Sequence, residues 1–182
     1  MSSGSRRTQY ITFAQMDEAI SEVAELARSA SLEVVLVGGC ALQFFGSDRL
    51  TANVDFAADG LLTQLPTLGL LSFGGIQTKT STGVPVDWIV RSDDYAALYQ
   101  SAIRNAIRIP CLPLPVAAPA YLAAMKMVAR RKKDEADLEA LIDSGELDLH
   151  ETRLLVRRLL GAYAADDLES YIQTSPLQRR KE

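Results

Sequence analysis

The sequence contains few of the residues that metal centres, disulfide frameworks and hydrolytic triads require. Its 182 residues include two cysteines, Cys40 and Cys111, and one histidine, His150. A single histidine argues against a histidine-rich zinc site and against a Ser-His-Asp triad, because both need imidazole groups beside other reactive side chains. Two cysteines in apolar surroundings do not make a disulfide framework either.

The chain also lacks long hydrophobic runs and a strong excess of basic residues. No apolar run approaches the roughly 20 residues that cross a bilayer as a helix. With 23 acidic and 19 basic residues the formal net charge is −4, which excludes a strongly basic coat for nucleic acid. The polar start MSSGSRRTQY has none of the apolar core of a signal peptide. We therefore expect a reduced, cytoplasmic protein.

What is present is the pattern of a globular α+β protein. Apolar residues at helical spacing predict a helix from Phe13 to Ser29, with Thr12 as its cap. Short β-branched or alternating segments follow, and the chain turns helical from Asp93 onward. Strands are expected at 33–37, 50–57, 75–79 and 84–91, with an edge strand at 112–116. The further helices are expected at 40–45, 93–106, 120–131, 134–143, 150–162 and 166–174.

Three polar features stand at the ends or on the faces of these strands. Gly38-Gly39 ends the first strand, and such a turn lets the backbone approach a phosphate at a helix N-terminus. Thr51, Asn53 and Asp55 share one face of the second predicted strand, where residues two apart lie about 7 Å apart at Cα. Asp87 stands on a later strand between apolar residues. Together these side chains predict a magnesium site that would bind nucleotide phosphates and activate a hydroxyl.

Each feature also has an ordinary structural interpretation, and the sequence leaves both open. Gly38-Gly39 can be a plain turn, Asp55 can end a strand, and Asp87 can lie on the solvated face of a hairpin. Arg49 and Thr51 can bind phosphate, orient the carboxylates, or simply stand where a strand begins.

The segments occur in a recognisable order. They read Gly38-Gly39-Cys40-Ala41, Arg49-x-Thr51-x-Asn53-Val54-Asp55 and Val86-Asp87-Trp88, followed by Leu122-Ala123-Ala124-Met125-Lys126 and Lys133-Asp134-x-x-Asp137-Leu138. This order resembles the nucleotidyltransferase-fold superfamily, in particular the bacterial minimal nucleotidyltransferases and the AbiEii-like toxins of abortive-infection systems. The family pattern is Gly-Gly-small-Ala, then Arg-x-Thr-x-Asp-hydrophobic-Asp, then a later lone Asp. The resemblance covers roughly residues 34–142.

The resemblance implies a fold and an activity. The fold is a small mixed β-sheet flanked by helices, with a C-terminal helical subdomain. We expect a nucleotidyltransferase-like core at 11–116, a helical subdomain at 117–176, and flexible tails at 1–10 and 177–182. The activity is transfer of a nucleotidyl group from an NTP to a hydroxyl on protein, RNA or a small molecule, with Mg²⁺ or Mn²⁺ as cofactor.

The resemblance also assigns roles to residues. The metal ligands would be Asn53, Asp55 and Asp87, of which Asp55 and Asp87 are catalytic and Asp87 is the candidate base for the acceptor hydroxyl. The nucleotide would be bound by Gly38, Gly39, Arg49, Thr51 and Lys126.

One departure from the family pattern puts the activity in question. The first metal-binding Asp of the family is Asn53 here, which removes a full negative charge from the site and weakens cation binding. Asp59 does not replace it, because it falls past the expected strand end. A second hypothesis follows: a catalytically silent protein of this fold that binds a partner protein or a nucleotide, for instance within a toxin–antitoxin pair.

The helical half supplies further charges. Lys126, Arg130 and Lys133 follow helical spacing and are expected on one helix side. This allows a third hypothesis, a nucleic-acid-binding module that uses the basic segment 126–133; the ordinary alternative is a solvated helix end. Asp134 is expected to cap its helix, and Asp137 to pair with a nearby cation.

Overall fold

A five-stranded mixed sheet and seven helices make up residues 9–176, the part of the chain that this computed structural model describes. The predicted tail residues 1–8 and 177–182 lie outside the described part. Along the chain the elements are α1 (Phe13–Ser29), β1 (Val34–Val37), α2 (Gly38–Gln43), β2 (Val54–Ala58), β3 (Gly69–Leu70), β4 (Gly75–Lys79), β5 (Pro85–Ile89), α3 (Ala96–Arg104), α4 (Pro119–Ala129), α5 (Lys132–Ser144), α6 (Leu149–Leu160) and α7 (Ala162–Thr174).

The order of the strands brings two distant segments together at the middle of the sheet. The spatial order is β1-β2-β5-β4-β3. Only β2 and β5 run parallel, and Asp55 is paired in register with Asp87. The other neighbours are antiparallel, and Val37, the last residue of β1, faces Asp55. The end of β1 and the starts of β2 and β5 therefore meet at one edge of the sheet.

Local sequence explains the first elements. Thr12 accepts a hydrogen bond from the backbone N–H of Gln15, and the Gln15 side chain accepts one from the backbone N–H of Thr12, which forms a capping box at the start of α1. The four residues of β1 are all buried, as their β-branched and leucine side chains predict. The predicted first helix and first strand are confirmed.

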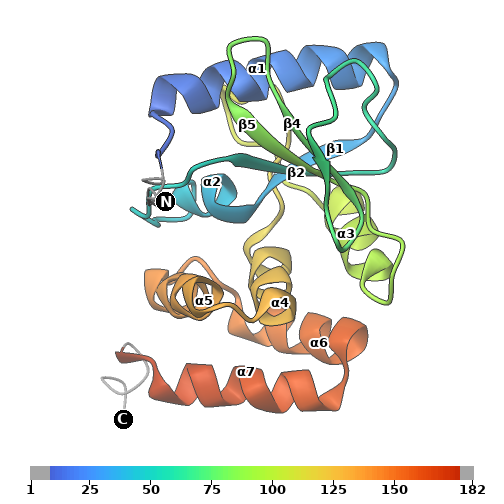
Figure 1. The fold of residues 1–182 in the computed structure, drawn as a ribbon. Coiled ribbons are helices and arrows are strands. Elements are labelled where there is room, and N and C mark those ends of the chain that lie inside the picture. The colour runs from blue at the N-terminus through green and yellow to red at the C-terminus, as the bar shows by residue number, and fades with distance from the viewer. Residues whose placement is uncertain (1–8, 177–182) are drawn as a thin grey trace, which may run out of the picture.

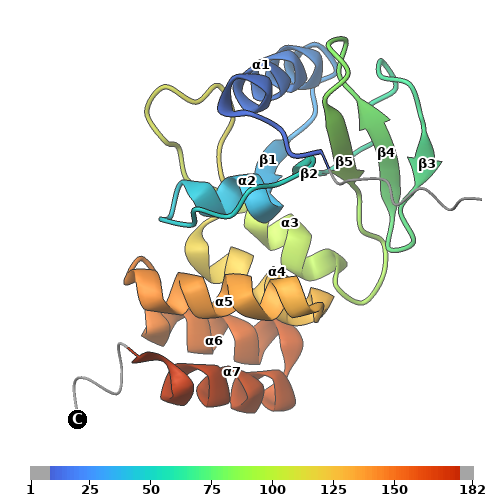
Figure 2. The ribbon, with the colours of Figure 1, turned by 60° about the vertical axis from the view of Figure 1, so that its left-hand side comes forward.

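The elements form two parts that share one hydrophobic core. Figure 1 shows α1 on one side of the sheet and α2 and α3 on the other. Beneath them, α4 packs against α5 and α6, and α6 packs against α7, so that α7 lies farthest from the sheet (Figure 2). The middle layer is made by α4, which is buried along most of its length from Ala120 to Met127. The predicted fold class, a mixed sheet flanked by helices with a C-terminal helical part, is confirmed.

Two predicted strands differ in the structure. The second strand starts at Val54 and not at residue 50, because the Thr51 hydroxyl bonds to the carbonyl of Asn53 and holds a turn-like segment there. The expected edge strand at 112–116 is absent from the described residues as a strand. Val116 alone forms isolated bridges with Leu36 and Ile107, because the prolines around it lack the N–H that a ladder needs.

The helical half corrects two expectations about the basic segment. Helix α4 ends at Ala129, and Arg130 adopts a left-handed conformation with φ 51°. Lys126 and Lys133 therefore lie on different helices, and the single basic helix face expected for residues 126–133 does not form. Asp134 is the third residue of α5 and not its cap, although its carboxylate accepts a hydrogen bond from the cap residue's backbone N–H.

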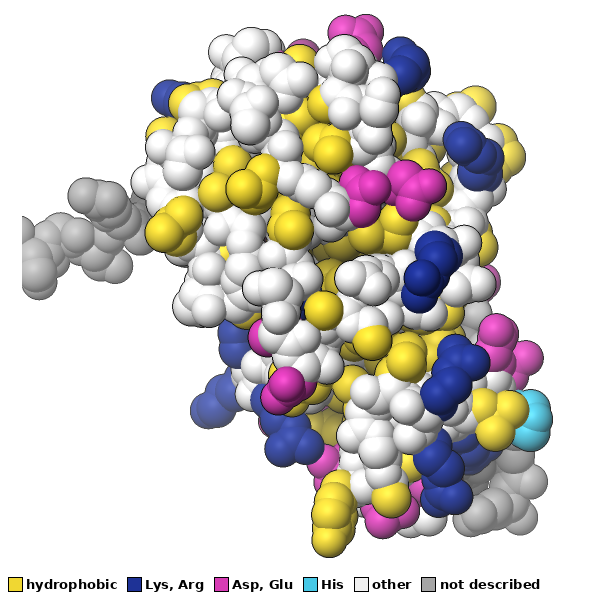
Figure 3. Space-filling model, turned by 90° about the vertical axis from the view of Figure 1, so that its right-hand side faces the viewer, with side chains coloured by type: hydrophobic (Ala, Val, Ile, Leu, Met, Phe, Trp, Pro, Cys, Tyr) yellow, Lys and Arg dark blue, Asp and Glu magenta, His cyan; other side chains and the backbone are white. Residues whose placement is uncertain are grey.

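The helices and the surface charges can be compared with the expectations that no segment crosses a membrane and that no strongly basic coat binds nucleic acid. Among residues 9–176, no helix is both long and apolar enough to cross a membrane. On the face drawn in Figure 3, Lys and Arg side chains are more numerous over the helical half but are separated by acidic, apolar and uncharged ones. That face therefore presents no continuous basic surface.

Candidate functional site

The site is centred on two carboxylates from neighbouring parallel strands. Asp55 is the second residue of β2 and Asp87 the third of β5, and their register places them side by side. Neighbouring strands lie about 4.8 Å apart, and paired residues project to the same face of the sheet. Both side chains are half-buried. The Gln77 side-chain amide of β4 donates to Asp87 at 3.5 Å, and Gln77 is the residue in register with Asp87 on that strand.

A glycine turn lies directly against the Asp55 carboxylate. Gly38 follows β1 with φ +69°, and a Cβ added there would stand 2.0 Å from Asp55 Oδ2. Gly39 lies close to the other side of the site, where an added Cβ would stand 2.7 Å from Arg49 Nη2 and 3.2 Å from Thr51 Oγ1. The two glycines thus allow a backbone approach that no larger residue permits.

Asn53 joins the two carboxylates. Its side-chain nitrogen donates to Asp55 Oδ1 at 2.8 Å and to Asp87 Oδ2 at 2.9 Å. An amide NH₂ has two hydrogens, so each carboxylate receives one of them.

The backbone of Asn53 is itself held in place. Its carbonyl accepts from the Thr51 hydroxyl at 3.0 Å and from the Cys40 thiol at 3.5 Å. Burial raises the pKa of Cys40 well above the ordinary value for a thiol, so this group stays protonated and acts as a donor. Thr51 and Cys40 thereby fix the segment from which the Asn53 amide reaches the carboxylates.

Arg49 and Lys126 converge on Asp137 of α5. Arg49 holds Asp137 with two hydrogen bonds, Nε to Oδ1 at 2.6 Å and Nη2 to Oδ2 at 3.0 Å. The buried Lys126 ammonium donates to Asp137 Oδ2 at 2.5 Å and to Asp134 Oδ1 at 3.2 Å. Asp134 is also bound by Arg131. The two cations expected to bind phosphate are therefore engaged in an ion network that ties the sheet half to the helical half.

The charges around the two carboxylates come from both halves of the protein. Burial, and then the neighbouring Asp87, raises the pKa of Asp55 to about 6, while Lys126 and Lys133 act in the opposite direction. Burial raises the pKa of Asp87 as well, against the hydrogen bond from Gln77 and the charges of Lys133 and Arg131. The positive charge of the exposed Lys133 thus lowers the pKa of both carboxyl groups.

We expect Asp55→Asn to remove a pH dependence of stability. Because the pKa of Asp55 is raised to about 6 in the folded chain, its protonation favours folding below the unfolded value of about 4, and this contribution is lost as pH rises through about 6. Over that window the wild-type free energy of unfolding should fall by about 2 kcal/mol relative to the variant. Urea unfolding of both proteins in EDTA from about pH 4 to pH 7 measures the difference. A difference that stays constant with pH would contradict the expectation.

The donor set of the site meets the needs of a divalent cation only in one orientation of Asn53. Within residues 9–176, no group of three or more His, Cys, Asp and Glu residues could hold a metal. Two carboxylates and one amide oxygen are nevertheless oxygen donors of the kind that Mg²⁺ prefers. Asn53 supplies that oxygen only when its amide is turned, because the NH₂ group now faces Asp55 and Asp87. With the amide turned, the residues fit the cation.

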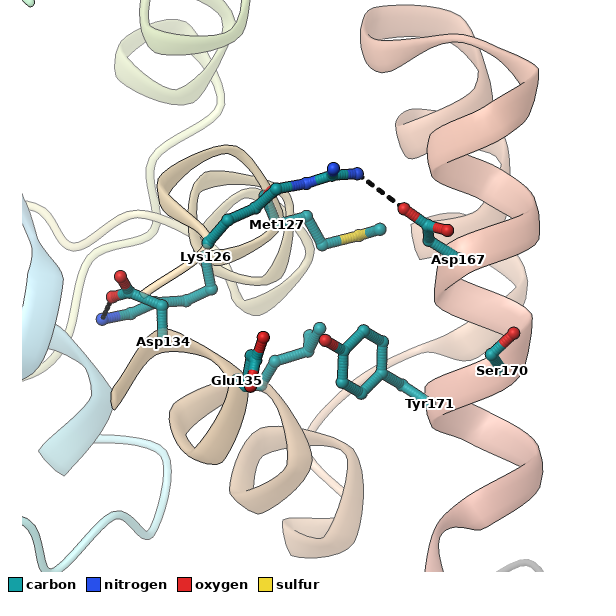
Figure 4. A pocket seen from close by; sticks show the side chains of 9 residues that line it. Lys126, Met127, Asp134, Glu135, Asp167, Ser170 and Tyr171 are labelled. Atoms are coloured by element: carbon teal, nitrogen blue, oxygen red, sulfur yellow. Dashed lines mark hydrogen bonds and ion pairs between the residues drawn. The ribbon is translucent and has the colours of Figure 1, made fainter. Parts of the chain in front are cut away.

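A separate cavity lies in the helical half. It measures about 350 Å³ between α4, α5 and α7, and its lining includes Met127, Tyr171 and the Arg130–Asp167 ion pair. Figure 4 shows the Lys126 side chain passing along it with its ammonium turned to Asp134, away from Tyr171. This cavity is lined by neither Asp55 nor Asp87. The apolar stem of Lys126 lines this cavity. Its ammonium group belongs to the ion network with Asp134 and Asp137.

Sequence reasoning missed three contributors to the site. Gln77 could have been found from the alternation of the hairpin, since it points to the opposite face from Ile76 and Thr78. Arg131 and Lys133 belong to the basic segment 126–133, and no sequence pattern places them near Asp55 and Asp87. Their position depends on how α5 packs against the sheet half.

Two solved structures are similar to this chain at low sequence identity. An antigenic nucleotidyltransferase-like protein from Paracoccidioides brasiliensis is 17% identical, with 92% of this chain and 96% of that chain covered and a TM-score of 0.49. The antibiotic-resistance factor ANT(2'')-Ia is 12% identical, with 93% and 97% covered and a TM-score of 0.47. No family model and no curated protein matches the sequence. Similarity at this level says nothing about activity, so the function has to be inferred from the site.

Proposed function

We propose that the chain is a nucleotidyltransferase-like protein that binds an NTP at Asp55 and Asp87 and transfers its nucleotidyl group to a hydroxyl. The observation that carries this proposal is the pairing of the two carboxylates in register on parallel strands, with the Gly38 turn against them. Paired carboxylates beside a close backbone approach suit a phosphate group and the hydroxyl that attacks it.

The reaction assigns each residue a task. The acceptor oxygen forms a bond to the α-phosphorus, and the bond from that phosphorus to the pyrophosphate oxygen breaks. Asp87, the less deeply buried of the two carboxylates, accepts the proton of the acceptor hydroxyl. The Gly38-Gly39 turn lets the side chains of Asp55, Arg49 and Thr51 lie directly against the backbone.

A divalent cation would be held by Asp55, Asp87 and the amide oxygen of Asn53. When bound, Mg²⁺ or Mn²⁺ neutralises charge on the phosphate oxygens and lowers the pKa of a bound hydroxyl. Lys133 and Arg131 add positive charge on the helical side of the carboxylates. Arg49 and Lys126 instead hold the carboxylate of Asp137, so their charges serve the ion network and not the nucleotide.

Asp87→Asn is expected to lower the rate of nucleotidyl transfer by at least about a hundredfold, the usual loss when a general base is removed. The assay follows label from the α-phosphate of ATP, GTP, CTP and UTP into RNA, protein or small-alcohol acceptors, with Mg²⁺ or Mn²⁺ present. The substitution keeps the size of the side chain, so the thermal midpoint should remain close to that of the wild type.

Asp94→Asn is the matched control, since Asp94 is an exposed aspartate outside the site. It should transfer at the wild-type rate. Equal rates for the wild type, Asp87→Asn and Asp94→Asn would remove Asp87 from the mechanism. An absence of transfer from all four nucleotides to any acceptor would count against the enzymatic proposal itself.

A second candidate function is a silent member of the same fold that binds a nucleotide or a partner protein, as in a toxin–antitoxin pair. The specific observation in its favour is the Asn53 amide between the two carboxylates, where it satisfies both of them without a cation. Thermal unfolding with each NTP, with and without Mg²⁺, separates the candidates. A nucleotide at a hundredfold excess over its Kd adds about 2.7 kcal/mol. A shift without transfer supports the silent protein, and a metal-dependent shift with transfer supports the enzyme.

A further inference from the structure

We infer that the side-chain amide of Asn53 is a built-in substitute for the cation at Asp55 and Asp87, and that it has to turn over before a cation can bind. The inference rests on the proposed function in one respect, that the cation and the amide use the same carboxylates. It goes further in two ways. The site is stable without metal, and a cation binds by replacing the Asn53 NH₂ group as the partner of Asp55 and Asp87.

The position of the amide supports the substitution. Its nitrogen lies within 2.9 Å of one oxygen of each carboxylate, which is where a group joining two anions has to be. Two half-buried carboxylates in register on adjacent strands repel each other. A donor shared between them offsets that repulsion without a net charge, since each amide hydrogen carries a partial positive charge.

The spacing allows the exchange without movement of the backbone. Magnesium holds oxygen ligands at about 2.0–2.1 Å in an octahedron, so neighbouring ligands lie about 2.9 Å apart. The amide nitrogen of Asn53 already lies 2.8 and 2.9 Å from the carboxylate oxygens. Half a turn of the amide, a torsion with a broad profile, would put its oxygen at that nitrogen's place and at the spacing of a magnesium ligand.

The surrounding contacts confine the replacement of the amide by a cation to the Asn53 side chain. The carbonyl of Asn53 is fixed by Thr51 and Cys40, both of which bond to the backbone and not to the amide. The amide can therefore turn while its main chain stays in place. An aspartate at residue 53 could ligate the cation but could not bridge the two carboxylates without it. When no metal is bound, its carboxylate would add a third negative charge about 3 Å from the other two.

The direct test observes the amide itself. Asn53 and Asn105 are the two asparagines of the chain, so their side-chain NH₂ resonances can be assigned by comparison with one variant. Asn105, whose amide donates to the carbonyl of Ser101, is the reference. In EDTA, the Asn53 NH₂ should exchange with solvent at least tenfold more slowly than that of Asn105. On titration with millimolar Mg²⁺ alone, its resonance should shift and its protection should be lost.

Two outcomes of this titration would overturn the inference. Exchange of the Asn53 amide as fast as that of Asn105 in EDTA would mean that it does not bridge the carboxylates. A protected amide that stays unchanged in millimolar Mg²⁺ would mean that the cation does not replace it. Neither measurement needs a nucleotide or an acceptor, so a failure to detect transfer leaves this test intact.

Variants give an independent readout in thermal unfolding. Asn53→Asp should melt at least about 5 °C below the wild type in EDTA and should gain more from Mg²⁺ than the wild type does. Asn105→Asp is the matched control and should respond equally little to both conditions. Where Asn53→Asp does not fold without metal, Asn53→Ala removes the bridge without adding charge and should still lower the midpoint in EDTA. Midpoints equal to that of the wild type for both Asn53 variants in EDTA would overturn the inference.

Discussion

Lys126→Met is expected to destabilise the protein by about 3 kcal/mol, the lower end of the range for breaking a buried ion pair. The Lys126 ammonium is buried and bonds to Asp134 and Asp137, which are buried too. Methionine keeps the apolar stem but leaves these carboxylates with fewer partners. Arg49 and Arg131 compensate in part, since each holds one of them. For a chain of this length, the thermal midpoint should fall by about 6–12 °C.

Lys132→Met is the matched control. Lys132 is the exposed first residue of α5, so the same chemical change there should shift the midpoint by only a degree or two, in keeping with the small effects of surface substitutions. Nucleotide binding adds a second readout, because a cation that serves only the ion network should leave NTP affinity nearly unchanged in the folded variant. A midpoint for Lys126→Met equal to that of Lys132→Met would contradict the role of Lys126 in holding the two halves together.

Local sequence patterns predicted the elements whose cause is local. The Thr12 cap and the apolar spacing after it determine where α1 begins, and the capping box is present in the structure. A run of Val and Leu between polar residues is enough for β1. The glycine pair predicted a tight turn after that strand, and Gly38 has the positive φ that such a turn requires.

The meeting of Asp55 with Asp87 depends on pairing that no local pattern contains. Alternation of apolar and polar residues shows which side chains share a face of one strand, but it does not say which strand lies next to it. The parallel pairing of β2 with β5 puts these carboxylates in register across 32 positions of sequence. The order of the motifs along the chain suggested this pairing only through resemblance to a family.

Two other features depend on tertiary packing. Arg49 reaches Asp137 across a sequence separation of 88 residues, and the pairing required the helical half to be placed against the sheet. The left-handed turn at Arg130 ends α4 at Ala129, two residues before the predicted helix end at residue 131. Arginine rarely adopts a positive φ, so no residue preference predicts this position of the break.

Gly38→Ala is expected to cost about 2–5 kcal/mol and to displace the Asp55 carboxylate. Two effects add. An L-residue with a side chain in the left-handed region costs roughly 1–2 kcal/mol. In addition, the new Cβ would lie 2.0 Å from Asp55 Oδ2 and 2.6 Å from its Cγ, so the carboxylate must move, at a cost of about 1–3 kcal/mol for overpacking. Thermal or urea unfolding measures the sum.

Gly83→Ala separates these two effects. Gly83 has φ +88°, and nothing lies within 4 Å of a Cβ added to it, so the variant carries the backbone cost alone. The excess of Gly38→Ala over Gly83→Ala then measures the contact with Asp55. Because that contact also fixes where Asp55 meets the Asn53 amide, Gly38→Ala should speed exchange of the Asn53 NH₂, whereas Gly83→Ala should not. Equal destabilisation by the two alanines would mean that the turn at Gly38 needs glycine for its backbone conformation and not for its approach to the carboxylate.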